Sequence, residues 1–316
     1  MAREVENNPH QAGEILASRG EKVIQQLSEA VRPDNAEGIH DLRVAIRRLR
    51  TAMQDLGPIS DKKAGRKLNK ELKAIADLAG KVRDHDVAIA VLERLASEAE
   101  APQILLGINE MIAGRRSRRD TDHQALLTTL SPKSTEELAA RIRKIAGFDE
   151  GVAMDPGLAA AVIGERCLAF LELVPSLYDP ADTKRHHRLR IAAKRLRYSA
   201  ELFDPLADDE NSAPRLIAEM QDHLGDMHDC DVWIRTLSKN LKNYVKNAGE
   251  ATPEFLAAEW LLGEFVRRRA KHYREALRLW MKWEQTGFID SMLSTSADQS
   301  PETEIPESST SGKVEG

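Results

Sequence analysis

Apolar residues recur along most of this chain at the three- and four-residue spacing that is typical of amphipathic helices. Prolines, glycines and short polar runs interrupt this spacing and divide the chain into successive predicted helices. These helices cover residues 9–30, 36–57, 61–78, 84–100, 103–130, 136–146, 159–177, 186–203, 215–241 and 254–283, with turns expected at Gly80 and Gly225. Charged residues make up 31% of the chain and aromatic residues only 4%, which also favours helices. We therefore predict an all-α protein with few or no strands.

The helix pattern contains an internal repeat. The basic segment 40–50 (HDLRVAIRRLR) returns as segment 187–197 (HRLRIAAKRLR), and this register of 147 residues holds without a gap from residue 9 to residue 58. Helices that follow one another through short connections form antiparallel bundles. The repeat therefore predicts two four-helix bundles related by a pseudo-two-fold, which cover residues 9–130 and 158–290 and are joined by a connector at residues 131–157.

The repeated helix carries a cationic stripe beside its apolar stripe. At about 100° per residue, Arg43, Arg47 and Arg50 fall within about 60° of one another, next to the sector of the apolar residues. His40 begins this stripe, and the second copy consists of His187, Arg190, Lys194 and Arg197. A stripe that flanks the core faces a groove between neighbouring helices, whereas a solvated stripe usually lies opposite the core. Each stripe extends about 15 Å along its helix, which is several times the length of one phosphate group.

No acidic residue lies on either stripe to offset its charge. Like charges four residues apart on a helix repel each other by roughly 0.2–0.5 kcal/mol per pair. Two interpretations are open: the stripes bind an extended polyanion, or they pair with carboxylates of neighbouring helices, such as Asp84, Asp86, Asp229 and Asp231. The duplication of the stripe in register favours a ligand.

A second motif also occurs twice, as LAGKVRDHDV at residues 78–87 and HLGDMHDCDV at residues 223–232. One interpretation is catalytic, because the His-Asp doublets at 85–86 and 228–229 resemble those that hold divalent cations in helical phosphohydrolases. The doublets do not align in the repeat, whereas the glycine and two aspartates do. A structural role is favoured, since glycine lets a helix bend or restart and aspartate caps backbone N–H groups and orients arginines.

Other basic residues extend the candidate surface. Arg19 and Arg166 are equivalent in the repeat, and Lys70 and Lys73 share one helix face. Arginine runs also occur at residues 115–119 and 267–274. Tyr198 is the only aromatic residue that interleaves with the stripes, which disfavours a nucleic-acid partner because single strands bind by stacking on exposed rings.

Charge and cysteine content limit the class of protein. The net charge is −5, but residues 291–316 hold five carboxylates against one lysine and almost nothing apolar, so we expect a disordered acidic tail there. Cys167 and Cys230 fit no metal spacing and imply no disulfide framework. No signal peptide is recognisable and no apolar run approaches the ~18 residues of a membrane span. We expect a soluble, cytoplasmic protein without a membrane partner.

The string IHDLRVAIRRLRTAM, its copy at residue 187, and the segments GKVRDHDV and MQDHLGDMHD together resemble the CHAD family, the conserved histidine alpha-helical domain. The resemblance covers nearly everything but the tail, and we expect the domain to span residues 9–290. It implies two four-helix bundles, a basic surface or channel between them, and binding of inorganic polyphosphate without catalysis, in some members at polyphosphate granules. The matching histidine and basic positions are His40, Arg43, Arg47, Arg50, His187, Arg190, Lys194 and Arg197.

We therefore expect a polyphosphate-binding module that needs no cofactor or metal and is not an enzyme. The expected site comprises Arg19, His40, Arg43, Arg47, Arg50, Lys70, Lys73, Arg115, Arg119, Arg166, His187, Arg190, Lys194, Arg197, Arg267 and Arg274. The main alternative is a metal-dependent phosphohydrolase that uses His85, Asp86, His228 and Asp229. A further alternative is an RNA- or DNA-binding protein.

Overall fold

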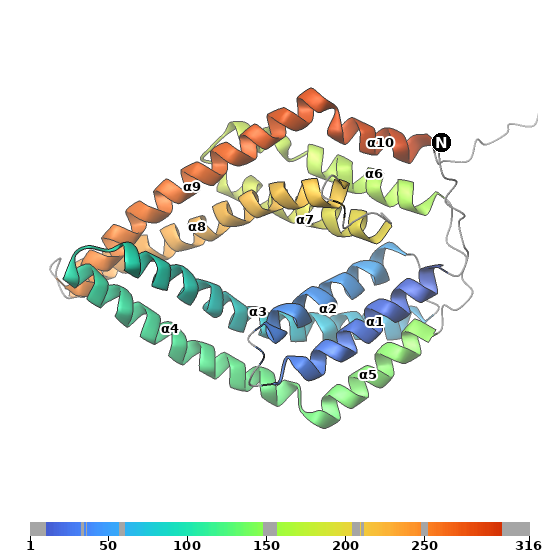
Figure 1. The fold of residues 1–316 in the computed structure, drawn as a ribbon, viewed down its shortest axis with the longest axis horizontal. Coiled ribbons are helices and arrows are strands. Elements are labelled where there is room, and N and C mark those ends of the chain that lie inside the picture. The colour runs from blue at the N-terminus through green and yellow to red at the C-terminus, as the bar shows by residue number, and fades with distance from the viewer. Residues whose placement is uncertain are drawn as a thin grey trace, which may run out of the picture.

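The protein is a series of helices in a computed structural model, which describes residues 11–32, 35, 37–56, 61–147, 157–203, 209, 212–247 and 252–298 (Figure 1). The first five helices are α1 (Gln11–Glu29), α2 (Gly38–Asp55), α3 (Lys62–Glu98), α4 (Pro102–Thr129) and α5 (Pro132–Gly147). The second five are α6 (Leu158–Leu171), α7 (Thr183–Phe203), α8 (Ala213–Asn247), α9 (Pro253–Thr286) and α10 (Phe288–Asp298), and the 3-10 helix η1 (Val174–Tyr178) precedes α7. These residues contain no strand, so the predicted all-α class is confirmed.

The turns predicted at Gly80 and Gly225 are wrong. Both glycines lie inside continuous helices, α3 and α8. A Cβ atom at Gly80 would lie 3.5 Å from Nη2 of Arg43, so this glycine leaves room for a guanidinium of α2. The glycine signal therefore reflects helix packing at this position and not a break in the backbone.

Helix α10 was not predicted. Gly287 has a φ of 63°, in the left-handed region that ends helices, and the chain turns there from α9 into α10. Because α10 continues to Asp298, the acidic tail does not begin at residue 291 as expected. Residues 299–316 lie outside the described part of the chain.

Three hydrophobic cores hold the helices together. The first joins α1, α2, α5 and the beginning of α3 and includes Leu27, Leu42 and Leu72. The second joins α6, α7, the beginning of α8, the end of α9 and the beginning of α10, around Phe170 and Trp283. Residues 132–145 are part of the first core, through Leu138, Ile142 and Ile145, and are more than the connector that the sequence predicted. The pseudo-two-fold between the halves stays a prediction.

The third core lies where the α3–α4 and α8–α9 hairpins meet. It contains Leu92, Ile108, Leu237 and Leu261, each at most 1% exposed. The two hairpins pack closely, since a Cβ at Gly107 of α4 would lie too near the backbone of α9. The two halves of the chain are therefore joined by a shared core in addition to the α2–α7 contact.

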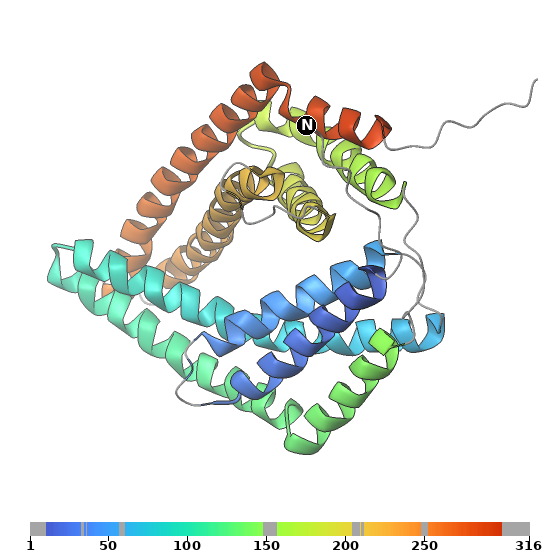
Figure 2. The ribbon, with the colours of Figure 1, turned by 45° about the vertical axis from the view of Figure 1, so that its right-hand side comes forward.

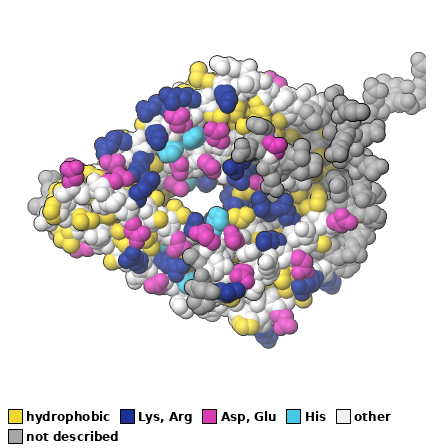
Figure 3. Space-filling model, in the orientation of Figure 1, with side chains coloured by type: hydrophobic (Ala, Val, Ile, Leu, Met, Phe, Trp, Pro, Cys, Tyr) yellow, Lys and Arg dark blue, Asp and Glu magenta, His cyan; other side chains and the backbone are white. Residues whose placement is uncertain are grey.

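The helices surround a central opening. On one side α2 contacts α7, on the other α4 contacts α9, and the long helices α3 and α8 run between these contacts (Figures 1 and 2). The space-filling view shows the opening and a group of Lys and Arg side chains beside it (Figure 3). Within the described helices, none is both long and apolar enough to cross a membrane.

Candidate anion-binding site

Helices α2 and α7 bring the two cationic stripes together. Each helix buries Leu and Ala residues of its apolar face, which leaves the adjacent stripe at the α2–α7 contact. The charges that lower the pKa of Lys194 of α7 are those of Arg47 and Arg43 of α2 and of Arg190, one turn earlier in α7. We call these four residues, Arg43, Arg47, Arg190 and Lys194, the central cation cluster. Residues that are 147 positions apart in the repeat thus form one positively charged site.

In the middle of this cluster, Arg47, Arg190 and Lys194 form no ion pair among the described residues, although Asp229 lies near Arg190. The Nε atoms of Arg47 and Arg190 are buried and form no hydrogen bond. Burial lowers the pKa of the Arg47 guanidinium, and its neighbours Arg43 and Arg197 lower it further. Burial, followed by Arg47, Arg190 and Arg43, lowers the pKa of the Lys194 amine to about 8. Burial and neighbouring cations thus disfavour the charged forms of these side chains. This arrangement favours an external anion as their partner.

The ends of the stripes do have partners within the protein. Nη1 of Arg43 lies 3.5 Å from Oδ1 of Asp84, on α3. Arg50 donates to the side-chain oxygen of Asn69 at 2.7 Å, and Arg197 donates to Glu201 at 2.9 Å. The expectation that the stripes lack counter-ions is therefore wrong for Arg43 and Arg197. Asp84 is 79% exposed, so the Arg43 pair lies in solvent and is weak.

The aromatic ring of Tyr198 packs against two arginines of the cationic stripes. The guanidinium carbon of Arg47 lies 4.5 Å from the centre of the Tyr198 ring, and that of Arg197 lies 5.5 Å from it. Tyr198 is only 5% exposed, so the ring packs against the two arginines and is not available to stack on a base. The sequence contained a signal for this contact, because Tyr198 follows Lys194 by one helical turn.

The two stripe histidines differ in their surroundings. His40 is exposed on α2. Nδ1 of His187 lies 3.1 Å from Nδ1 of His228. These two nitrogens form a hydrogen bond when one carries a proton and the other does not, so the accepting ring is neutral. Burial, with Arg190 and Arg235, lowers the pKa of His187, and burial followed by Arg190 lowers that of His228 to about 4. Burial and the neighbouring arginines therefore disfavour the charged form of His187 in the free protein.

The repeated aspartates hold arginines of neighbouring helices. Asp86 accepts a hydrogen bond from Arg119 at 2.9 Å and joins α3 to α4, and Asp231 accepts one from Arg269 at 2.5 Å and joins α8 to α9. These contacts agree with the structural interpretation of the second motif. Burial raises the pKa of Asp229 to about 6, although nearby Arg190 lowers it.

The residues of the alternative phosphohydrolase site do not come together as a metal centre. His85 contacts Asp122 at 3.2 Å, and its neighbour Asp86 is bound by Arg119. His228 faces His187 instead. Across the residues that the structure describes, no three His, Cys, Asp or Glu side chains are grouped as metal ligands would be.

The remaining predicted residues near the stripes have mixed surroundings. Arg166 forms an ion pair at 3.0 Å with Asp55, whose side chain is 2% exposed and also accepts from Ser199. Lys73 pairs with Asp77 at 2.5 Å. Arg19 is half-buried, and burial and then the charge of Arg48 lower its pKa. Lys70 is exposed on α3. Arg166 therefore holds α6 against the α2–α7 contact and is less suited to ligand than predicted.

The basic residues of α4 and α9 are also mostly engaged. The guanidinium carbon of Arg115 lies 4.5 Å from the centre of the Trp233 ring. Arg119 pairs with Asp86, Arg267 pairs with Glu264, and Arg274 is exposed.

Trp233 is a further residue of this region that was not singled out from the sequence. Its ring stacks on that of Phe265 with ring centres 4.9 Å apart. Its position directly after the repeated motif was the only signal.

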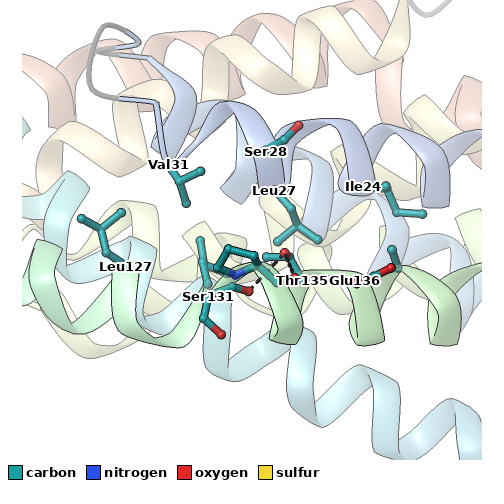
Figure 4. A pocket seen from close by; sticks show the side chains of 11 residues that line it. Ile24, Leu27, Ser28, Val31, Leu127, Ser131, Thr135 and Glu136 are labelled. Carbon is teal, nitrogen blue, oxygen red and sulfur yellow. Dashed lines mark hydrogen bonds between the residues drawn. The ribbon is translucent and has the colours of Figure 1, made fainter.

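A cavity elsewhere in the protein is unsuitable for an anion. It has a volume of about 690 Å³ and lies between α1, the end of α4 and α5 (Figure 4). Its walls are mainly apolar and include Ile24, Leu27 and Leu127. Glu136 is the charged residue of its wall, and no residue of the expected site lines it.

Comparison with known proteins relates the chain to one family and to solved structures of the same fold. The family model described as the CHAD domain matches residues 14–238. The crystal structure of the CHAD domain from the plant Ricinus communis has a TM-score of 0.62 at 21% identity and covers 88% of this chain and 94% of that chain. PptA from Streptomyces chartreusis has a TM-score of 0.63 at 14% identity and covers 87% of this chain and 100% of that chain. No curated protein matches the sequence.

Proposed function

The chain belongs to the CHAD domain family, and from this premise we propose that it is a binding module for inorganic polyphosphate. The observation that carries the proposal is the central cation cluster, in which Arg47, Arg190 and Lys194 come together from two helices and form no ion pair in the described chain. A bound polyanion would supply the missing negative charge. Arginine forks would bind phosphate oxygens in pairs, and Lys194 would act as a point charge.

An extended ligand suits the arrangement better than a single phosphate. The cluster joins two helices, and each stripe continues along its helix for about 15 Å. His40 lies at the exposed beginning of the α2 stripe and Lys70 on the exposed face of α3. A chain of phosphates could contact several of these groups at once, and each contact would add to the affinity.

Inorganic polyphosphate is favoured over nucleic acid because the cluster offers charge without stacking surfaces. Tyr198 is covered by arginines, and Trp233 is covered by Arg115 on one side and packs on Phe265. Single-stranded nucleic acids gain roughly 1–3 kcal/mol per stacked base from exposed rings. A polymer without bases loses nothing in such a site.

We further propose that the two halves, residues 9–130 and 158–290, each supply one cationic helix as products of a duplication. The protein would act by binding and not by turnover. We propose a cytoplasmic location with association to polyphosphate granules.

A titration with polyphosphates of graded length tests the proposal. We expect affinity to increase with chain length and to fall steeply with salt, by analogy with counter-ion release from nucleic acids. RNA at equal charge concentration should compete poorly. Equal binding of RNA and polyphosphate would contradict the proposed ligand, and release of phosphate by the protein would support the phosphohydrolase alternative.

Charge reversal in the cluster tests the site. Arg47→Glu together with Arg190→Glu should lower polyphosphate affinity by at least about a hundredfold, because two unpaired cations become repulsive charges. Arg188→Glu together with Arg195→Glu is the matched control with the same change of net charge: both arginines are exposed on α7 outside the stripe, and their reversal should change affinity much less. Circular dichroism verifies that both variants stay helical. Equal losses in the two variants would refute the site.

A further inference from the structure

Lys194 differs from an ordinary surface lysine in its surroundings. It is half-buried at the α2–α7 contact, and the charges that act on its amine are those of three arginines. The neighbouring carboxylates serve other cations: Asp84 of α3 pairs with Arg43, and Glu201 of α7 pairs with Arg48 and Arg197. Asp229 of α8 faces Arg190. No ion pair joins Lys194 to a carboxylate in the described chain, so its amine is set among cations.

Such surroundings make an amine nucleophilic. Three neighbouring positive charges and partial burial disfavour its protonated form, and the pKa of Lys194 is about 8. At pH 7.5 about a quarter of this amine is uncharged, compared with about one thousandth of an ordinary lysine. An uncharged amine is the form that attacks a carbonyl group.

The same residues are suited to hold a phosphate group beside that amine. Arg47 and Arg190 both act on the charge of Lys194, each residue is partly exposed, and neither forms an ion pair in the described chain. A small molecule that combines a phosphate with a reactive carbonyl would meet arginine donors and the Lys194 amine together. Acyl phosphates, which are mixed anhydrides of a carboxylic acid and phosphate, have this structure.

We propose that Lys194 is a site of modification by acyl phosphates. The phosphate group of the reagent binds to Arg47 and Arg190, and Nζ of Lys194 attacks the carbonyl carbon. A C–N bond forms, the bond between the carbonyl carbon and the phosphate oxygen breaks, and phosphate leaves with the electron pair of that bond. The amine loses one proton to water, so the products are an amide and inorganic phosphate.

Modification of Lys194 would also regulate the site, an extension that rests on the proposed function. Amide formation removes one positive charge from the central cation cluster and adds an uncharged acyl group at its centre. A polyanion would then bind less tightly. Conversely, bound polyphosphate would occupy the arginines and favour the protonated form of the Lys194 amine, which does not react with carbonyl groups. It would therefore protect Lys194 from modification.

Mass spectrometry of the full chain after treatment with acetyl phosphate at pH 7.5 tests the modification. Exposed Lys70 of α3 is the internal comparison. The larger neutral fraction of Lys194 is partly offset by lower intrinsic nucleophilicity, as known for thiols, so we expect about tenfold faster acetylation than at Lys70. The N-hydroxysuccinimide ester of acetic acid, an uncharged donor, should show a smaller preference. Added inorganic phosphate should reduce the preference for acetyl phosphate only.

Two results would overturn the modification site. Acetylation of Lys194 no faster than that of Lys70 with either donor would show that the amine is not activated. An equal preference with both donors, unaffected by phosphate, would show that the arginines do not hold the reagent.

The regulatory extension has a separate test. Polyphosphate affinity of the chain should fall about tenfold or more after acetylation, whereas the affinity of Lys194→Arg, whatever its starting value, should not change on the same treatment. Selective acetylation with unchanged affinity would refute the regulation. Failure of the untreated chain to bind polyphosphate would refute the proposed function and leave the acetylation result standing.

Discussion

Polyphosphate binding should take up a proton at Lys194, and its affinity should therefore fall as the pH rises. In the free protein, burial and three arginines lower the pKa of this amine to about 8. A bound polyanion adds negative charge around the amine and returns its pKa toward the ordinary value of about 10.4. The bound state thus holds a proton that the free state loses above pH 8.

The size of the effect follows from this pKa. Between pH 7 and pH 9, the fraction of free Lys194 that is protonated falls about tenfold, so the affinity should fall about tenfold, or about 1.4 kcal/mol. Proton uptake should be about half a proton per binding event at pH 8. The lowered pKa of His187 places most of its titration below this range, so Lys194 dominates the change.

Isothermal titration calorimetry measures both quantities. Titrations with long-chain polyphosphate at pH 7, 8 and 9 and constant ionic strength give the affinity, and buffers with different ionisation enthalpies give the number of protons. Lys194→Arg is the matched control, because arginine keeps its charge throughout this range and the pH dependence should flatten. Wild-type affinity that does not change with pH, or an equally steep dependence in Lys194→Arg, would refute the reasoning.

Three substitutions and one control test the packing that positions the site, all measured by chemical denaturation. Asp55→Ala removes the buried partner of Arg166 and should lower stability by about 2–4 kcal/mol, whereas loss of the exposed partner, in Glu165→Ala, should cost below about 1 kcal/mol. Gly107→Ala places a Cβ 2.2 Å from a backbone oxygen of α9 and should lower stability by about 2 kcal/mol or more, and an unchanged midpoint would contradict the close packing of the hairpins. Gly225→Ala meets no atom within 4 Å in a continuous helix and should raise stability by about 0.5–1 kcal/mol, whereas destabilisation would favour a turn there.

Most of the helices could be predicted because helical periodicity is a local property. The apolar spacing of residues 36–57 led to a helix that the structure places at Gly38–Asp55. The same periodicity placed Arg43 and Arg47 beside the apolar face, and the fold indeed leaves them at a contact between helices. Glycine was the least reliable local signal. It marks a turn at Gly287 but close approach of another chain segment at Gly80 and Gly107.

Other features depend on which helices meet, and the spacing of residues within one helix does not contain that information. The third core forms where the end of α3, the first half of α4, the second half of α8 and the first half of α9 meet. The partner of each cation also comes from elsewhere in the chain: Asp84 lies 41 residues beyond Arg43, and Asp55 lies 111 residues before Arg166. The sequence alone therefore does not show that Arg43 forms an ion pair with a carboxylate and that Arg47 does not.

The sequence by itself determined that this protein is helical and that two of its helices carry a basic edge beside their apolar face, because both properties repeat every 3.6 residues along a single helix. The tertiary structure decided that the two edges meet, that Arg43 and Arg197 pair with carboxylates of the protein, and that Arg47, Arg190 and Lys194 form no ion pair in the described chain. The reason is that a charge is balanced by whatever lies within a few ångströms of it, and helix packing brings those neighbours from distant parts of the chain.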